Sequence, residues 1–198
     1  MGKRFIYCSV FAFVTLCSFV SSKPGSTEKP DPCIQTSTTN LCKDSVLENE
    51  LCLLSDKLGI KLDTSCDTRL MSTLADWLGT PYHHAGYSKK GTDCSGFVSA
   101  IYKEVYGINL THSSRSMIYQ MKEKVKKEDL QTGDILFFKI HGKRKGISHV
   151  GIYLKDGMFI HASLYNGVSI GCLNCKYYIR AYYAAGRLSL NNKLALSK

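Results

Sequence analysis

The sequence contains little proline, a single tryptophan and only one long apolar run. It has 4 prolines in 198 residues, while 44% of the residues are hydrophobic and 11% are aromatic. This composition excludes a disordered chain, because it supplies enough apolar surface for a core. The apolar run over 5–20 is shorter than the roughly 20 residues that a membrane-spanning helix needs, which excludes a multi-pass membrane protein.

Acidic residues are also scarce, since 16 Asp and Glu stand against 26 Lys and Arg, for a net charge of +10. A basic chain is attracted to anionic polymers or surfaces, although the charge does not identify the partner. The basic clusters over 122–127 and 143–145 are typical of solvated loops or helix ends. Because no nucleic-acid-binding motif is present, nucleic acid is not an expected partner. No cofactor and no metal are expected either.

Residues 1–22 have the order of a secretory signal. Lys3 and Arg4 precede the apolar run, and small residues follow it. We therefore expect an exported protein, periplasmic or secreted. Without Lys3 and Arg4, 24 of the 26 basic residues remain against 16 acidic ones, a mature charge of +8. The alternative is an outer-membrane lipoprotein attached to the membrane through Cys17, but Leu16 stands where a small residue would be expected.

Nine cysteines are present, and seven of them follow the predicted signal. Thiols of exported proteins tend to pair, and an odd number leaves at least one over. Six lie in segments typical of disulfide staples: Cys33, Cys42, Cys52, Cys66, Cys172 and Cys175. The Cys172-x-x-Cys175 spacing also occurs in zinc sites, but without a second pair it favours a disulfide or a cross-link to the N-terminal segment. Cys94 is the one left over.

The pattern of apolar residues divides the chain into three parts: a signal over 1–22, a Cys-rich leader with a helical extension over 23–66, and a main domain over 67–190. The extension is too small for a core of its own, so we expect disulfides to hold it. Helical spacing predicts helices over 67–79, 94–106 and 113–123. Period-two alternation predicts strands over 134–140, 147–154, 158–163, 168–171 and 180–188. This order indicates an α+β domain, with N-terminal helices packed on an antiparallel β-sheet.

Cys94 lies where a glycine-containing loop runs into the predicted helix over 94–106. Unpaired N–H groups and the helix dipole at such a position stabilise negative charge, which lowers the pKa of a thiol. A thiolate is the nucleophile of cysteine hydrolases. Cys94 is therefore either a nucleophile or an inert, buried cysteine at a helix end, and two histidines favour the first interpretation.

His149 and His161 each interrupt an apolar strand, and a short turn joins the two strands. A two-residue turn would place the histidines on opposite faces of the sheet. A three-residue turn over 155–157, with a left-handed glycine, would instead pair Gly151 with His161. His149 would then lie diagonally across from His161, within hydrogen-bonding reach. We predict the three-residue turn, in which His149 accepts the Cys94 proton and His161 orients the His149 ring.

Several ordered motifs resemble those of the NlpC-type cell-wall cysteine peptidases, which are bacterial enzymes with a papain-like α+β fold. The motifs are Tyr82, Asp93-Cys94-Ser95-Gly96-Phe97, Thr132-Gly133-Asp134, His149-Val150-Gly151-Ile152-Tyr153 and His161-Ala162-Ser163. The likeness runs from about Leu70 to Leu188. Within the family, the sequence most resembles the compact murein endopeptidases of the MepS kind.

The resemblance implies a peptidoglycan endopeptidase that cuts peptide stems or cross-links, at D-alanyl–diaminopimelate or D-glutamyl–diaminopimelate bonds. It assigns the nucleophile to Cys94, the base to His149 and the orienting role to His161. The expected partner is then peptidoglycan as the substrate, and the protein is expected to be a monomer. The alternatives are a cell-wall binding module that has lost turnover, and an amidase or acyltransferase that acts on another amide or ester.

The resemblance also implies roles beside the nucleophile. Tyr82 would form an oxyanion hole with the Cys94 N–H, and Asp93 and Ser95 would line the substrate groove. A packed aromatic is the alternative for Tyr82, and a helix cap for Asp93. Residues 83–86 (His-His-Ala-Gly) stand where the family usually has an aromatic residue and two glycines. We expect the two histidines to be exposed loop residues and not metal ligands.

Overall fold

The computed structural model describes residues 38–140 and 146–188, with side chains from residue 46 onward. The predicted signal and most of the predicted leader lie outside these residues. No helix in the described ranges combines the length and the apolar content that crossing a bilayer requires.

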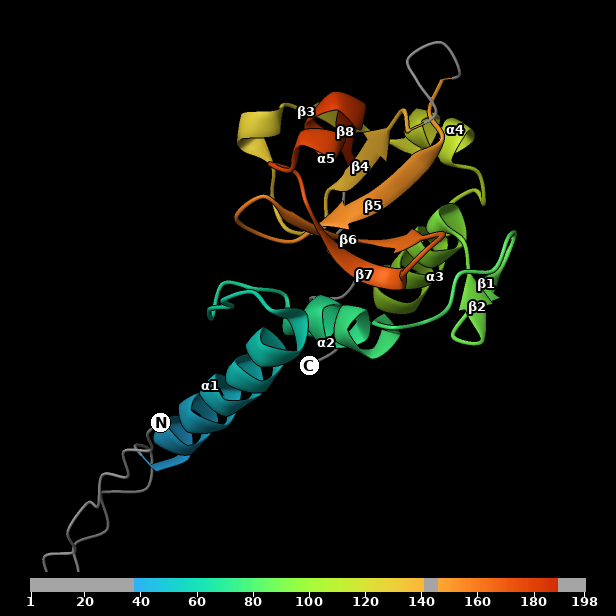
Figure 1. The fold of residues 1–198 in the computed structure, drawn as a ribbon. Helices are drawn as coiled ribbons and strands as arrows, with labels where there is room; N and C mark the ends of the chain where they lie inside the picture. Colours follow the sequence, from blue (N-terminus) through green and yellow to red (C-terminus); the bar gives the residue numbers. More distant parts are fainter. Residues whose placement is uncertain (1–37, 141–145, 189–198) are drawn as a thin grey trace, which may run out of the picture. The chain divides into compact units, whose positions relative to one another are not determined.

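In the described part of the chain most helices precede the strands of the main sheet, and one short helix lies near the end (Figure 1). The helices are α1 (Thr38–Leu58), α2 (Thr68–Trp77), α3 (Cys94–Tyr106), α4 (Ser114–Met117) and α5 (Lys176–Ala181). Asp67 caps α2 by accepting a hydrogen bond from the Leu70 N–H at 3.0 Å, and α3 ends at Gly107, which is left-handed. The predicted helices at 67–79 and 94–106 are confirmed. The one predicted over 113–123 is only α4 followed by a 3₁₀ turn over Ile118–Gln120.

Six strands form one sheet in the order β3-β8-β4-β5-β6-β7, and all its pairs are antiparallel. They are β3 (Glu123–Val125), β4 (Ile135–Phe138), β5 (His149–Tyr153), β6 (Met158–Ser163), β7 (Gly167–Cys172) and β8 (Tyr182–Arg187). A small hairpin of β1 (Tyr87–Ser88) and β2 (Gly91–Thr92) precedes α3. The predicted α+β architecture with an antiparallel sheet is confirmed.

Two elements differ from the sequence prediction. The segment predicted as a strand from 180 onward begins inside α5, so β8 starts only at Tyr182. The short strand β3 was not predicted, because Glu123 and Lys124 are exposed and give no apolar alternation. It joins the sheet through pairing with β8, a contact that is distant in sequence.

Both faces of the sheet are covered. Along β4 the side chains alternate: Ile135 and Phe137 belong to the core that α1, α2 and α3 share, whereas Leu136 and Phe138 belong to a second cluster that includes Ala181 of α5. All four are fully buried. In Figure 1, α3 lies alongside β5 and β6 of this sheet, and it contacts both of them as well as β1. The start of α3 is thereby brought to the middle of the sheet.

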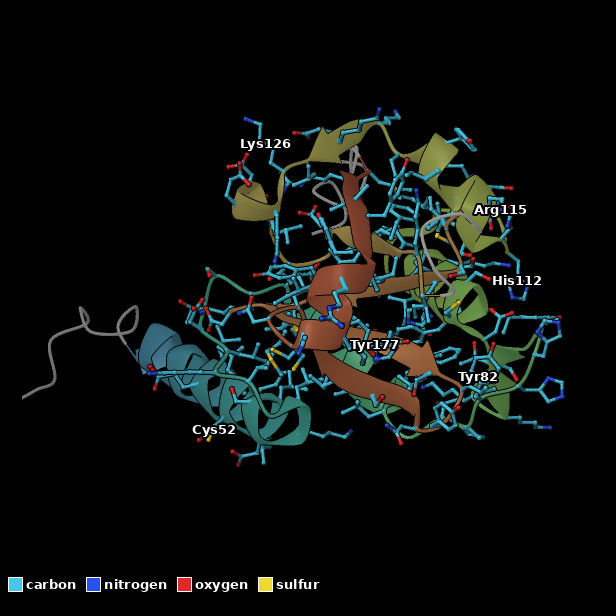
Figure 2. All side chains as sticks on the ribbon, turned by 45° about the horizontal axis from the view of Figure 1, so that its top comes forward. Cys52, Tyr82, His112, Arg115, Lys126 and Tyr177 are labelled. Atoms are coloured by element: carbon cyan, nitrogen blue, oxygen red, sulfur yellow. The ribbon has the colours of Figure 1, made fainter. Side chains whose placement is uncertain are left out.

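Leucines attach α1 to the main core. Leu51, Leu54 and Leu58 are buried in the same cluster as α2 and α3. Apolar packing therefore holds α1 within the described residues. The disulfides expected for the extension stay a prediction, because Cys33 and the side chain of Cys42 lie outside what the structure describes. Cys52 lies on the outer side of α1 and is exposed (Figure 2). The boundary between 66 and 67 stays a prediction.

Candidate active site

The candidate nucleophile, Cys94, is the first residue of α3. Asp93 caps this helix, because its Oδ1 accepts a hydrogen bond from the Gly96 N–H at 2.7 Å while its own backbone is extended (φ −95°, ψ 179°). An Asp in this position satisfies an N–H group that has no partner within the helix. The cap determines where the loop turns into the helix, and therefore where Cys94 is held.

Burial dominates the protonation of Cys94. The residue is 9% exposed, and burial raises the pKa of its thiol to about 11. The backbone N–H groups of Val150 and Ser95 act in the opposite direction and lower this pKa, whereas the charge of Asp93 raises it. The helix-start effect predicted from the sequence is present, but desolvation outweighs it. The expectation of a lowered pKa is therefore wrong for the resting protein, in which Cys94 is a neutral thiol at neutral pH.

The register of β5 and β6 brings the two histidines together. Ile152 pairs with Ile160, so the preceding residue, Gly151, stands opposite His161. The turn spans 155–157, and its glycine is left-handed with a φ of 76°. The three-residue turn is confirmed. A Cβ on Gly151 would lie 2.8 Å from the Ile160 carbonyl oxygen and 3.2 Å from His161 Cβ. Gly151 therefore permits close approach of the two strands.

The two imidazoles are in direct contact. His149 Nε2 lies 2.8 Å from His161 Nδ1, with the rings at 89° to each other. Phe159 stacks on His161 at 5.0 Å between ring centroids, and Phe138 lies 5.9 Å from His149. Burial lowers the pKa of His161 to about 4, so this imidazole is neutral at neutral pH. The prediction that the histidines share one face of the sheet is confirmed, and Nδ1 is the His149 nitrogen that does not face His161.

A cavity of about 870 Å³ is lined by Cys94, His149, His161 and Tyr82. Most of its other described lining residues belong to β6, β7, the turn between them and α5, where Figure 2 labels Tyr177. None of the described lining residues is Lys, Arg, Asp or Glu. The described wall thus offers hydroxyl, amide, imidazole and aromatic groups, and it can orient a ligand by shape and neutral hydrogen bonds.

Tyr82 lies beside the nucleophile. Its backbone bridges to Thr92, two residues before Cys94, and the neighbouring His83 N–H donates to the Thr92 carbonyl oxygen at 3.0 Å. Burial, followed by the charges that Cys94 and Asp93 can carry, raises the pKa of Tyr82. The Tyr82 hydroxyl therefore stays protonated and can donate a hydrogen bond.

Asp93 and Ser95 do not belong to the described cavity lining. The Asp93 carboxylate accepts hydrogen bonds from the Ser95 hydroxyl at 3.0 Å and the Ala85 N–H at 3.1 Å, in addition to Gly96, and its Oδ1 lies 3.0 Å from His112 Nε2. Burial raises the pKa of Asp93, but the hydrogen bonds from Gly96, His112 and Ser95 outweigh burial and hold this pKa below its usual range. The helix-cap interpretation is confirmed, and contact of either residue with substrate stays a prediction.

Sequence reasoning missed two residues of this region. It found no partner for His112, which contacts Asp93 across 19 positions. It also passed over Tyr178 of α5, whose hydroxyl lies 3.1 Å from His161 Nε2. Neither residue belongs to a local sequence motif, so its contact with the site is visible only in the folded structure. His83 and His84 are exposed, and no three His, Cys, Asp or Glu side chains within 46–140 and 146–188 are grouped as in a metal site.

Known proteins are similar to this chain in sequence. A protein from Haemophilus influenzae named "Probable endopeptidase" is 40% identical over 113 residues, which are 57% of this chain and 69% of that protein. The Escherichia coli K12 protein named "Murein DD-endopeptidase MepS/Murein LD-carboxypeptidase" is 37% identical over 121 residues, or 61% of this chain and 62% of that protein.

A crystal structure of an NlpC/P60 family protein from Bacillus cereus superposes with a TM-score of 0.57 at 37% identity. The match covers 64% of this chain and 41% of that chain. The sequence profile of the NlpC/P60 family matches residues 79–187, which include Tyr82, Cys94, both histidines and every strand of the main sheet. The chain belongs to the NlpC/P60 family.

Proposed function

We propose that the protein is a cysteine hydrolase that cleaves peptide bonds of bacterial peptidoglycan. The observation that carries this proposal is the meeting of Cys94, from the start of α3, with the His149–His161 pair in one cavity. A nucleophile, a base and a group that orients the base are the parts that acyl transfer needs. The relatives named as endopeptidases support the same reaction class.

The geometry supports the following sequence of steps. As the Cys94 sulfur attacks the scissile carbonyl carbon, His149 takes the thiol proton at Nδ1, while its Nε2–H donates to His161 Nδ1. Tyr82 and the Cys94 N–H stabilise the oxyanion of the tetrahedral intermediate. His149 then returns the proton to the leaving amine, and water hydrolyses the thioester. Because burial keeps Cys94 protonated at rest, the base must act during the attack itself.

The substrate follows from the named relatives and from the cavity. A stem peptide or cross-link of murein would enter the cavity beside β6 and β7, held by the neutral groups described above. The bond is D-alanyl–diaminopimelate in a cross-link, as the relative named a murein DD-endopeptidase suggests, or D-glutamyl–diaminopimelate within a stem. The masses of the products distinguish the two.

The test is digestion of purified muropeptides, with the new termini identified by mass spectrometry. Cys94→Ala should lower the rate by roughly 10⁴-fold or more, because it removes the nucleophile. Cys52→Ala is the matched control, since Cys52 is exposed on α1, and it should cleave at the wild-type rate. Activity retained in a folded Cys94→Ala variant would contradict the proposal. Binding to sacculi without cleavage by the wild-type protein would instead identify a wall-binding module, and cleavage of other amides or esters an amidase or acyltransferase.

We also propose export, for which the order of residues 1–22 is the support. The mature N-terminus, measured by mass spectrometry, distinguishes a cleaved signal from a lipid on Cys17. We propose a monomer, as the family resemblance leads us to expect. Light scattering at assay concentration tests this state.

In an oxidising compartment, Cys172 and Cys175 would pair. The Cys175 N–H donates to the Cys172 carbonyl oxygen at 3.1 Å, and such a four-residue turn keeps its end Cα atoms within about 7 Å, close to the range that a disulfide requires. Both cysteines are free thiols in the structure. A peptide that contains both residues and is lighter by two hydrogens before reduction would support the pairing. Alkylation of both thiols in the untreated exported protein would contradict it.

A further inference from the structure

Tyr178 extends the pair of histidines into a chain of three side chains. Its hydroxyl oxygen lies 3.1 Å from His161 Nε2, while His161 Nδ1 lies 2.8 Å from His149 Nε2. Both nitrogens of the His161 ring are therefore engaged, one by β5 and the other by α5. Tyr178 and both histidines also line the cavity that contains Cys94.

Aromatic packing holds the Tyr178 ring in place. Phe159 contacts it edge-on at 4.8 Å between centroids and 85°, and Phe138 lies 5.5 Å away at 63°. The His161 ring itself lies 5.6 Å from Tyr178 at 76° and is stacked by Phe159 on its own face. The same phenylalanine thus fixes both members of the hydrogen bond, so the hydroxyl position is set by packing.

The direction of the hydrogen bonds follows from the proposed role of His149. To accept a proton at Nδ1, a neutral His149 must carry its hydrogen on Nε2 and donate it to His161 Nδ1. His161 is neutral, because burial lowers its pKa to about 4, so its single hydrogen must then be on Nε2. That hydrogen points at the Tyr178 oxygen.

The opposite tautomer of His161 would block the reaction. A hydrogen on His161 Nδ1 would point at His149 Nε2, and the hydrogen of His149 would have to move to Nδ1. The nitrogen needed for the Cys94 proton would then be occupied. The productive tautomer instead places a hydrogen on His161 Nε2, and a buried N–H without a partner is costly. The Tyr178 oxygen, 3.1 Å away, supplies the acceptor that this tautomer needs.

We propose that Tyr178 is a positioning residue that accepts a hydrogen bond from His161 Nε2–H and thereby stabilises the histidine tautomers in which His149 can act as the base. This inference rests on the proposed function. Burial raises the pKa of Tyr178 to about 12, so the acceptor is a neutral hydroxyl. Its own hydrogen can turn toward the cavity.

The first test replaces Tyr178 by Phe, which keeps the ring and removes the acceptor. We expect kcat on muropeptides to fall roughly 10- to 100-fold with KM changed less than about twofold, because the substrate contacts remain. Tyr183→Phe is the matched control, since Tyr183 is half-exposed on β8 and outside the cavity lining, and it should retain the wild-type kcat.

A double-mutant cycle separates positioning from a general structural role. In a His161→Asn background, Tyr178→Phe should cause less than about a twofold further loss, since its effect passes through His161. An unchanged kcat in the single variant, or the same loss in both backgrounds, would overturn the inference.

Nitrogen NMR of the wild-type protein gives a readout that needs neither turnover nor a folded variant. The His161 ring should show its hydrogen on Nε2 at neutral pH, and a hydrogen on Nδ1 would overturn the inference. If Cys94→Ala retained activity, the proposed function would fail while the NMR result would still report the tautomer, so the two failures are distinguishable.

Discussion

Burial, more than any neighbouring charge, determines the protonation of the residues in the site. It raises the pKa of the Cys94 thiol to about 11, lowers that of His161 to about 4 and raises that of Tyr82. Each shift favours the uncharged form, because desolvation penalises charge of either sign. The resting site is therefore neutral at these three positions, and charge develops only when Cys94 attacks.

A prediction at this scale concerns stability in acid. The pKa of His161 is lowered from 6.5 to about 4 by folding, so at pH 4.5 the unfolded chain binds a proton that the folded chain largely does not. The contribution of neutral His161 to the stability of the folded protein is complete above pH 6.5 and is lost as the pH falls toward 4. At pH 4.5 the loss amounts to about 2 to 3 kcal/mol of unfolding free energy. Urea unfolding of the wild type and of His161→Asn at pH 7.5 and pH 4.5 measures the difference.

The wild type should lose more stability than His161→Asn between these pH values, by about 2 to 3 kcal/mol. His84→Asn, a change in an exposed loop, should follow the wild type. Equal losses in the wild type and in His161→Asn would show that His161 titrates normally in the folded protein.

At the scale of the elements, Asp93 connects the start of α3 to the loop before it. Its carboxylate holds the Gly96 N–H, the Ser95 hydroxyl and the Ala85 N–H, and it contacts His112. The carboxylate thus fixes both the helix that begins with Cys94 and the loop that departs from the family pattern.

Asp67 at the start of α2 is the matched comparison, because its carboxylate accepts from the Leu70 N–H at 3.0 Å and the Tyr106 hydroxyl at 3.2 Å. Asp67→Ala should cost about 1 kcal/mol of unfolding free energy and leave the cleavage rate unchanged. Asp93→Ala should cost about 2 to 4 kcal/mol, since it leaves several buried donors unpaired, and should also lower the cleavage rate at least roughly tenfold. Chemical denaturation and muropeptide digestion measure the two effects. Equal changes in unfolding free energy and in cleavage rate for the two variants would show that Asp93 acts only as a helix cap.

At the scale of the whole molecule, one apolar core joins α1, α2 and α3 to the sheet. Leu54 of α1 lies in this core together with Leu74 of α2, Phe97 of α3 and Ile152 of β5. The N-terminal extension therefore contributes to the stability of the domain through packing, without a cross-link in the described residues.

Adjacent leucines on α1 test this packing. Leu54 is 8% exposed and Leu53 is 71% exposed. Leu54→Ala should lower the free energy of unfolding by about 2 to 4 kcal/mol, because it opens a cavity in the core. Leu53→Ala should change it by no more than about 0.5 kcal/mol. A single urea transition in both variants, with the midpoint lowered only in Leu54→Ala, is expected. Equal midpoints would show that α1 does not unfold with the rest of the domain.

Local pattern was sufficient for much of the fold and for the centre of the site. The bounds of α3 and β6 were predicted to the residue. Gly107 ends α3, and a turn with a left-handed glycine, Gly157, precedes β6. The contact between the His149 and His161 side chains also followed, since the turn length determines hairpin register. Prediction failed for β3 and α5, where pairing and packing with distant segments outweigh local preference.

The amino-acid sequence alone determined the family resemblance, the antiparallel α+β order and the three residues that meet in the cavity, since periodicity and turn chemistry act between near neighbours. Only the tertiary structure decided the resting protonation of Cys94, the partners of Asp93 and the contact of Tyr178 with His161. These properties depend on which distant segments remove a group from water and which polar atoms they bring to it, and sequence spacing records neither.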